Sequence, residues 1–147
     1  MYKRILIATD GSRRSRRAVA RGVALAKSLG AAVVGFHARL PDPVLYYGEP
    51  VALPAATWER LEKESIKAAE THLAQILTAA KKAGVDYRGI SISSTSPSEA
   101  IIKTAKKEKC DLIVMASHGR KGVSQLLLGS ETIKVLTHSR IPVLVTR

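Results

Sequence analysis

Gly119 and the adjacent pair Gly129–Ser130 have the residue types and spacing that could bind a phosphate group. They follow an apolar run at 111–115 with the composition of a buried parallel strand, and Ser130 begins a segment of helical periodicity. Glycine lets a backbone approach a phosphate closely, and the free N–H groups at a helix start favour negative charge. The order of strand, glycine-bearing loop and helix start therefore predicts a site for the phosphates of a nucleotide.

The spacing excludes two common phosphate-binding loops. The chain has no Gly, four residues, Gly-Lys-Ser/Thr string, and it lacks the G-x-G-x-x-G fingerprint. The residues alone leave a second interpretation open, in which Gly119 forms a tight turn and Ser130 caps a helix without any ligand.

The same residues resemble the universal stress protein family, in its ATP-binding branch. That family has Gly-x-x-Gly, nine residues, then Gly-Ser/Thr, and its second and third glycines correspond to Gly119 and Gly129. Ala116 stands in place of the first glycine. We expect its methyl group to weaken binding, by crowding the ribose or by forcing a β-region backbone, because alanine tolerates positive φ poorly. The resemblance extends from the segment 5–12 to the segment 141–146.

The resemblance implies a nucleotide site at the ends of three strands. Asp10 would lie against the base and ribose, Ala38 would line the adenine pocket, and His118 would contribute largely through its backbone near the ribose and phosphate. We expect a homodimer, because the family pairs its short, apolar C-terminal edge strand with that of a second copy. The expected nucleotide-binding residues are Ala8, Thr9, Asp10, Ala38, Met115, Ala116, His118, Gly119, Arg120, Gly129, Ser130, Glu131 and Thr132.

Charged and hydroxyl groups surround the expected phosphate position. Ser130 would cap its helix and donate its hydroxyl to a phosphate, assisted by the N–H groups of Glu131 and Thr132. We expect the carboxylate of Glu131 to point away, because it would repel a phosphate. The arginine cluster at 13–17 has two interpretations: solvent screens it, or it adds positive potential at the mouth of the site.

Strand and helix patterns alternate along the chain, which predicts an α/β fold. Five strands with helical crossovers predict a doubly wound, open five-stranded parallel sheet with about four helices, in one domain spanning residues 1–147. In such sheets a ligand lies beyond the carboxyl ends of the strands, where the strand order reverses. The expected strands are Lys3–Ala8, Ala31–Ala38, Tyr87–Ser93, Asp111–Ala116 and Pro142–Thr146. The expected helices are 13–29 after a Ser12 cap, Trp58–Lys82, 97–108 after a Ser96 cap, and Ser130–His138.

Composition narrows the class of protein. The net charge of +12 raises the question of a nucleic-acid partner, but an aromatic content of 4% offers few bases a stacking surface, so we expect none. No apolar run has the length of a membrane span, and no secretory signal precedes the first strand, so we expect a cytoplasmic protein. We interpret the lone Cys110 as a buried structural residue, and His37, His72 and His138 as structural or surface residues.

The resemblance, together with the candidate phosphate site, implies a stress-response sensor or switch that binds ATP, with Mg²⁺ as a further candidate cofactor. We assign no catalytic residue and no protein metal site. Three alternatives stay open: a slow ATPase or phosphotransferase, a charge-driven nucleic-acid-binding protein, and a ligand-free dimer in which Ala116 has disabled the pocket.

Overall fold

The computed structural model describes residues 1–41, 53–118 and 127–147, and these form one five-stranded sheet with helices on both faces. Every pair of neighbouring strands is parallel, and the strand order is β3-β2-β1-β4-β5. The strands are β1 (Arg4–Ala8), β2 (Ala32–Arg39), β3 (Tyr87–Ser93), β4 (Leu112–Ala116) and β5 (Val143–Thr146). The helices are α1 (Arg13–Leu29), α3 (Ala55–Ala83), α4 (Pro97–Lys107) and α5 (Ser130–His138). The expected fold class is confirmed.

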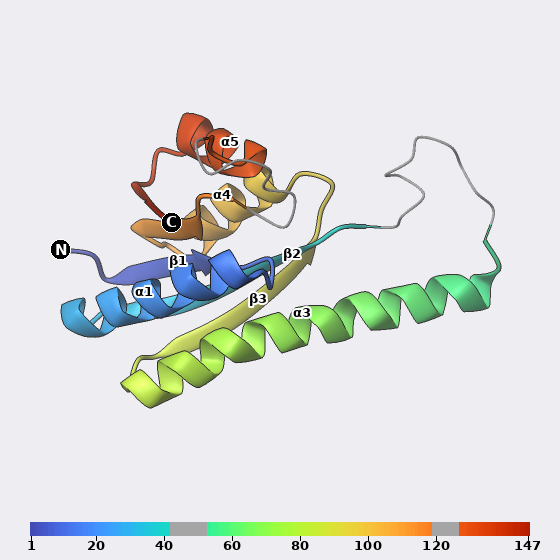
Figure 1. Cartoon of the computed structure of the whole chain (residues 1–147), viewed down its shortest axis with the longest axis horizontal. Helices are drawn as coiled ribbons and strands as arrows, with labels where there is room; N and C mark the ends of the chain where they lie inside the picture. The colour runs from blue at the N-terminus through green and yellow to red at the C-terminus, as the bar shows by residue number, and fades with distance from the viewer. Residues whose placement is uncertain (42–52, 119–126) are drawn as a thin grey trace.

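The sheet separates two helical layers (Figure 1). Helices α1 and α3 cover one face, where Ile7 and Val114 pack with Val23 of α1 and Ile76 of α3. Helices α4 and α5 cover the other face around Phe36. This two-sided burial explains why the central strands read as continuous apolar runs rather than as alternating patterns.

Local signals set the ends of two helices. The side chain of Ser12 accepts a hydrogen bond from the Ser15 backbone N–H at 3.1 Å, so Ser12 caps α1 as expected. Gly30 ends α1 and Gly84 ends α3, both in the left-handed conformation that glycine adopts without strain.

One expected helix start was wrong, and two expected capping roles differ in detail. Helix α3 begins at Ala55, three residues before the expected Trp58. Residues 42–52 lie outside the described residues. Ser96 occupies the N-cap position of α4, but its side chain makes no capping hydrogen bond. Helix α5 begins at Ser130 as expected, but its N-cap is Gly129, so Ser130 does not cap it.

Cys110 lies just before β4 and is buried, with 6% of its surface exposed. Burial raises the pKa of its thiol to about 11, an effect that the nearby Arg4 opposes and that Glu108 and Asp111 reinforce. The thiol is therefore protonated at neutral pH, which agrees with the expected structural role.

Candidate functional site

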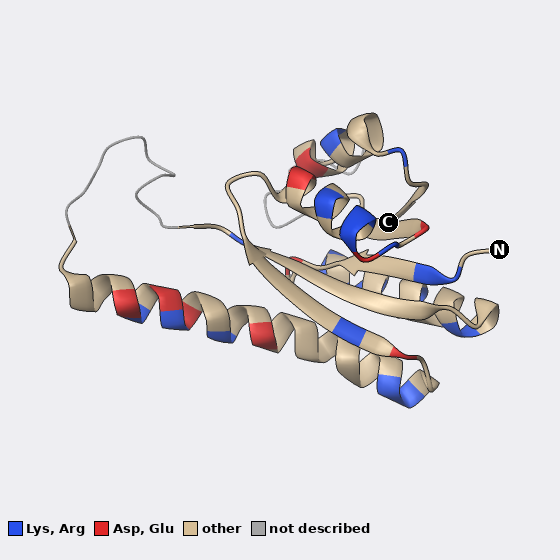
Figure 2. Cartoon of the chain, turned by 180° about the vertical axis from the view of Figure 1, so that it is seen from behind, with Lys and Arg blue, Asp and Glu red and all other residues tan. Residues whose placement is uncertain are grey.

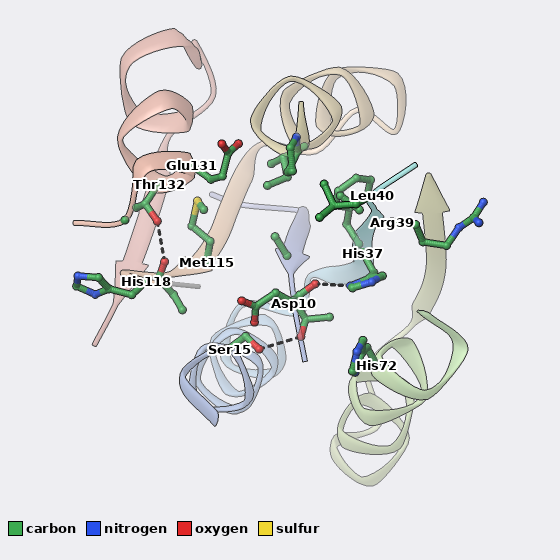
Figure 3. A pocket seen from close by; sticks show the side chains of 18 of the residues that line it. Asp10, Ser15, His37, Arg39, Leu40, His72, Met115, His118, Glu131 and Thr132 are labelled. Carbon is green, nitrogen blue, oxygen red and sulfur yellow. Dashed lines mark hydrogen bonds between the residues drawn. The ribbon is translucent and has the colours of Figure 1, made fainter. Parts of the chain in front are cut away.

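A cleft of about 530 Å³ lies at the carboxyl ends of β1, β2 and β4, beneath the first turn of α5 (Figure 3). At this point the strand order reverses, because β2 lies on one side of β1 and β4 on the other. This is the expected place for a ligand in a doubly wound fold. Residues from both helical layers complete its walls. The lining residues are Ala8, Thr9, Asp10, Ser15, Phe36, His37, Ala38, Arg39, Leu40, Ser65, Ala68, His72, Pro97, Ile101, Met115, Ala116, His118, Gly129, Ser130, Glu131 and Thr132.

Hydrogen bonds fix the turn that follows β1. The Thr9 hydroxyl accepts from the Gly11 N–H at 3.1 Å, and the Asp10 carboxylate accepts from the Ser12 N–H at 2.9 Å. The Thr9 and Ser15 hydroxyl groups share a further hydrogen bond of 3.1 Å. The hydrogen bond to Ser12 gives Asp10 the turn-stabilising role that aspartate often has. Asp10 also lines the cleft.

Two histidines form the wall of the cleft on the α3 side. The Nδ1–H of His37 donates to the Thr9 carbonyl at 2.8 Å, and the rings of His37 and His72 lie 4.9 Å apart between centroids. Gly11 has φ +78°, and a Cβ at that position would collide with the His72 ring. Only glycine therefore fits beside this imidazole, and the β1–α1 turn packs closely against α3.

Ala116 ends β4 in an extended conformation. Lys109 is the only non-glycine residue with positive φ within the described ranges, so alanine causes no backbone strain at position 116. The Thr132 hydroxyl donates to the Ala116 carbonyl at 3.1 Å and joins α5 to the end of β4. This β-region backbone is the conformation that we expected alanine to impose at position 116. Crowding of a ligand by the methyl group stays a prediction.

His118 is buried, and its ring is directed away from the centre of the cleft. Its Nδ1 shares a hydrogen bond of 3.1 Å with the Ser117 hydroxyl. Figure 3 shows Asp10 between the histidine pair on one side and His118 on the other, with the His118 ring on the outer side. This orientation suits the expected contribution through the backbone better than one through the imidazole.

The first turn of α5 opens onto the cleft. Gly129 precedes it in an extended conformation, and its N–H donates to the Ser117 carbonyl at 2.7 Å. The N–H groups of Ser130, Glu131 and Thr132 belong to the first turn, where no intrahelical acceptor exists. Together with the positive end of the helix they form a place for an anion.

Glu131 lines the cleft, but its carboxylate is engaged elsewhere. One oxygen accepts from the Ser98 N–H at 2.8 Å, and the other accepts from the Lys134 ammonium at 2.9 Å. Burial alone would raise the pKa of Glu131, but the hydrogen bonds from Lys134 and Ser98 outweigh it and hold the pKa below its usual value. The carboxylate therefore takes the role at the start of α4 that the Ser96 side chain does not fill.

All of the expected nucleotide-binding residues line the cleft except Gly119 and Arg120, which lie outside the described residues. The arginines at 13–17 do not line it. Sequence reasoning missed much of the α3 side, including His37 and His72, which we had expected to be structural or surface residues. Their positions at the end of β2 and on the inner side of α3 depend on tertiary packing. The missed lining residues are Ser15, Phe36, His37, Arg39, Leu40, Ser65, Ala68, His72, Pro97 and Ile101.

Two further features of the described ranges bear on the class of site. Residues 1–41, 53–118 and 127–147 contain no group of three or more His, Cys, Asp or Glu side chains placed to hold a metal ion. Within the same part of the chain, no helix has the length and apolar character needed to cross a membrane.

Comparison with known proteins identifies the family. The family model described as "Universal stress protein family" matches residues 1–147, and the chain belongs to this family. A universal stress protein of Thermus aquaticus is 40% identical over 147 residues, covering 100% of both chains. Universal stress protein MJ0531 of Methanocaldococcus jannaschii is 31% identical over 148 residues, covering 100% of this chain and 83% of that protein.

Solved structures agree with this assignment. The structure of the hypothetical protein MJ0577 superposes with a TM-score of 0.83 at 27% identity, covering 99% of this chain and 96% of that one. A universal stress protein crystallised in complex with cAMP superposes with a TM-score of 0.73 at 27% identity, covering 99% and 97%.

Proposed function

We propose that the cleft binds an adenine nucleotide, namely ATP, and that the protein is a nucleotide-dependent sensor or switch of the stress response. The observation that carries this proposal is the meeting of three features in one hollow. Asp10 stands at the end of β1, a small apolar residue stands at the end of β2, and the first turn of α5 faces both across the cleft.

The two ends of the cleft have the chemistry of the two ends of a nucleotide. Apolar side chains from β1, β2, β4 and α4 offer contacts for a flat base, with Asp10 beside them to accept a hydrogen bond from the base or the ribose. The free N–H groups of α5 offer a place for phosphates. The apolar lining residues are Ala8, Phe36, Ala38, Leu40, Ile101 and Met115.

The solved relative in complex with cAMP supports an adenine nucleotide as the ligand class. We favour ATP because the β4–α5 connection begins and ends with glycine-bearing segments that suit a chain of phosphates. Because we assign no metal site to the protein, any Mg²⁺ would arrive with the nucleotide phosphates.

Helix α3 offers a route by which occupancy of the cleft reaches the surface. Ser65, Ala68 and His72 line the cleft from α3, whose N-terminal half extends past the carboxyl ends of the strands (Figure 1). A ligand that contacts these side chains would favour one position of the helix over others, which is what a switch requires.

The substitution Gly129→Val tests the site. The backbone at Gly129 is extended, with φ −63° and ψ 150°, so valine can adopt the same backbone conformation while its side chain blocks the approach of a phosphate. We expect ATP affinity, measured by titration calorimetry, to fall at least about tenfold, or about 1.4 kcal/mol. Ala24→Val, which adds a valine to the exposed side of α1, is the control and should leave affinity unchanged. Equal affinity of both variants for ATP would contradict the phosphate site.

A further inference from the structure

The solvent side of α1 carries a concentration of arginine that the proposed nucleotide site does not use. Arg13, Arg16, Arg17 and Arg21 are exposed, and we refer to these four residues as the arginine face. The whole helix from Arg13 to Leu29 contains no acidic residue. None of the four lines the cleft.

No side-chain carboxylate pairs with this face within the described part of the chain. The ion pairs found there involve Arg39, Arg88, Lys103 and Lys134, and none comes from α1. Arg16 donates to the Gly11 carbonyl at 3.4 Å, and Arg21 donates to a main-chain oxygen of Arg147, the last residue of the sequence, at 3.1 Å. Helix α3 differs, because acidic and basic bands are mixed along it (Figure 2).

The arginine face lowers the stability of its own helix. Cations near a helix N-terminus oppose the helix dipole by about 0.3–1 kcal/mol each when exposed. The pairs Arg13/Arg17 and Arg17/Arg21 are like charges spaced i, i+4, and each pair costs about 0.2–0.5 kcal/mol. A local arrangement that is unfavourable for folding points to a use outside folding.

The residue composition of the arginine face indicates which class of partner it can bind. Protein interfaces centre on apolar and aromatic side chains, and helices that lie on membranes bury an apolar face. Between these arginines the exposed surface of α1 has only the small residue Ala20, and Ala24 follows within one turn. Phosphate groups need cations alone, and guanidinium groups bind them through paired hydrogen bonds. A polyphosphate surface therefore fits this face better than a protein or a lipid bilayer.

We propose that the arginine face binds the phosphate backbone of double-stranded nucleic acid without reading its bases. Residues spaced i, i+4 repeat about every 6 Å along a helix, and duplex DNA carries about one charge per 1.7 Å of its axis, so several arginines meet phosphates at once. Low aromatic content argued against a nucleic-acid partner because it removes base stacking. That argument applies to single strands and leaves contacts with a duplex backbone untouched.

Two variants of equal charge test the proposal. The first changes Arg13, Arg16, Arg17 and Arg21 to Gln. The second changes Lys81, Lys82, Lys106 and Lys107 to Gln, which removes the same charge from exposed positions on other helices. Affinity for a fluorescent 20-base-pair DNA duplex of mixed sequence is measured by anisotropy between about 50 and 200 mM salt, a range in which phosphate contacts change affinity strongly.

For the unchanged protein we expect binding that weakens with salt. The arginine variant should reduce the slope of log K against log salt by about 3.6, which is about 0.9 for each of four phosphate contacts. The lysine variant should keep affinity within about twofold at the higher salt. Thermal melting of the arginine variant should be unchanged or raised, because repulsion within α1 is removed.

Equal loss of binding in both variants would overturn the proposal, since net charge rather than the arginine face would then determine binding. Undetectable duplex binding by the unchanged protein at about 50 mM salt would also overturn it. Tighter binding to anionic phospholipid vesicles or to polyglutamate than to the duplex, at the same salt, would assign the face to a different class of partner.

Discussion

Glu131 belongs to α5 but stabilises the start of α4, and this single side chain ties the two helices of one layer together. Its carboxylate accepts from the Ser98 N–H in the first turn of α4, where the helix dipole also favours a negative charge. A carboxylate that would repel a ligand phosphate is thereby held by other partners. A substitution of Glu131 therefore tests how much this contact between α5 and α4 contributes to stability.

We expect Glu131→Gln to lower the free energy of unfolding by about 1 kcal/mol at pH 7, since a charge-assisted hydrogen bond becomes a neutral one. The pKa of Glu131 is lowered in the folded state, so its contribution to stability is fully present above the usual pKa of a glutamate and is lost as the pH falls through the lowered pKa of the folded state. Denaturant unfolding at pH 7 and pH 3 measures the difference between the two proteins.

The difference in stability between wild type and Glu131→Gln should narrow at pH 3. A difference that stays constant between pH 7 and pH 3 would show that the charge of Glu131 makes no contribution. The variant should also bind ATP at least as tightly as the wild type, because it removes a negative charge from the lining of the cleft.

At the scale of elements, the position of α3 on the sheet depends on two glycines and one tyrosine. The Tyr87 hydroxyl donates to the Leu73 carbonyl of α3 at 3.0 Å. A Cβ at Gly35 would lie 2.7 Å from the Tyr87 ring, and a Cβ at Gly89 would lie 2.7 Å from its hydroxyl oxygen. The ring therefore lies across the space that the two glycines leave beneath α3.

We expect Gly35→Ala to destabilise the protein by about 1–3 kcal/mol, because the added methyl group overpacks the α3 interface. Denaturant unfolding measures this cost. A double-mutant cycle provides the control: in a Tyr87→Ala background the same change should cost much less, because the colliding ring is gone. Equal costs in the two backgrounds would show that the strain lies elsewhere.

The elements that sequence predicted well are those whose ends depend on neighbouring residues. Ser12 and Gly30 mark α1 correctly because a cap and a left-handed glycine act within a few residues. Ser96 holds the expected N-cap position of α4, but its side chain makes no capping hydrogen bond, and a contact distant in sequence replaces it. Glu131 of α5 supplies the hydrogen bond at the start of α4.

In the site, too, the features that local sequence determines were predictable, and those that depend on distant contacts were not. The ends of β1 and β4 were predictable, because parallel strands place their carboxyl ends at one edge of the sheet. His72 was not predictable, since its place beside Gly11 depends on how a helix of 29 residues lies across the sheet. Periodicity identifies the inner face of such a helix, but it does not identify the residue that reaches the cleft.

At the scale of the whole molecule, β5 forms one edge of the sheet, and we propose that it pairs with a second copy of the chain. The carbonyl groups of Pro142 and Thr146 accept from Ile113 and Ser117 on the β4 side. The backbone N–H and C=O groups of successive residues point alternately to the two sides of a strand. The backbone groups of Leu144 therefore also point toward β4, and those of Val143 and Val145 point outward. A substitution that tests the edge must therefore change Val143 or Val145.

We expect Val145→Pro to convert a dimer into a monomer in sedimentation velocity, because it removes an outward N–H while leaving the β4 pairing intact. Ser93→Pro is the matched control. It removes an outward N–H from β3 at the opposite edge, so it should stay dimeric. A dimer that survives Val145→Pro, or is lost in Ser93→Pro, would place the interface elsewhere.

The strand order also has a consequence for how the chain folds while it is being synthesised. Strand β1 lies at the centre of the sheet, between β2 and β4, yet β4 begins only at Leu112. At a translation rate of about 5–20 residues per second, β1 waits roughly 5–20 seconds for its second neighbour. During that interval a strand with four buried apolar residues out of five has an open edge on the ribosome. The nascent chain, rather than the finished protein, is therefore the form most exposed to aggregation and most in need of a chaperone.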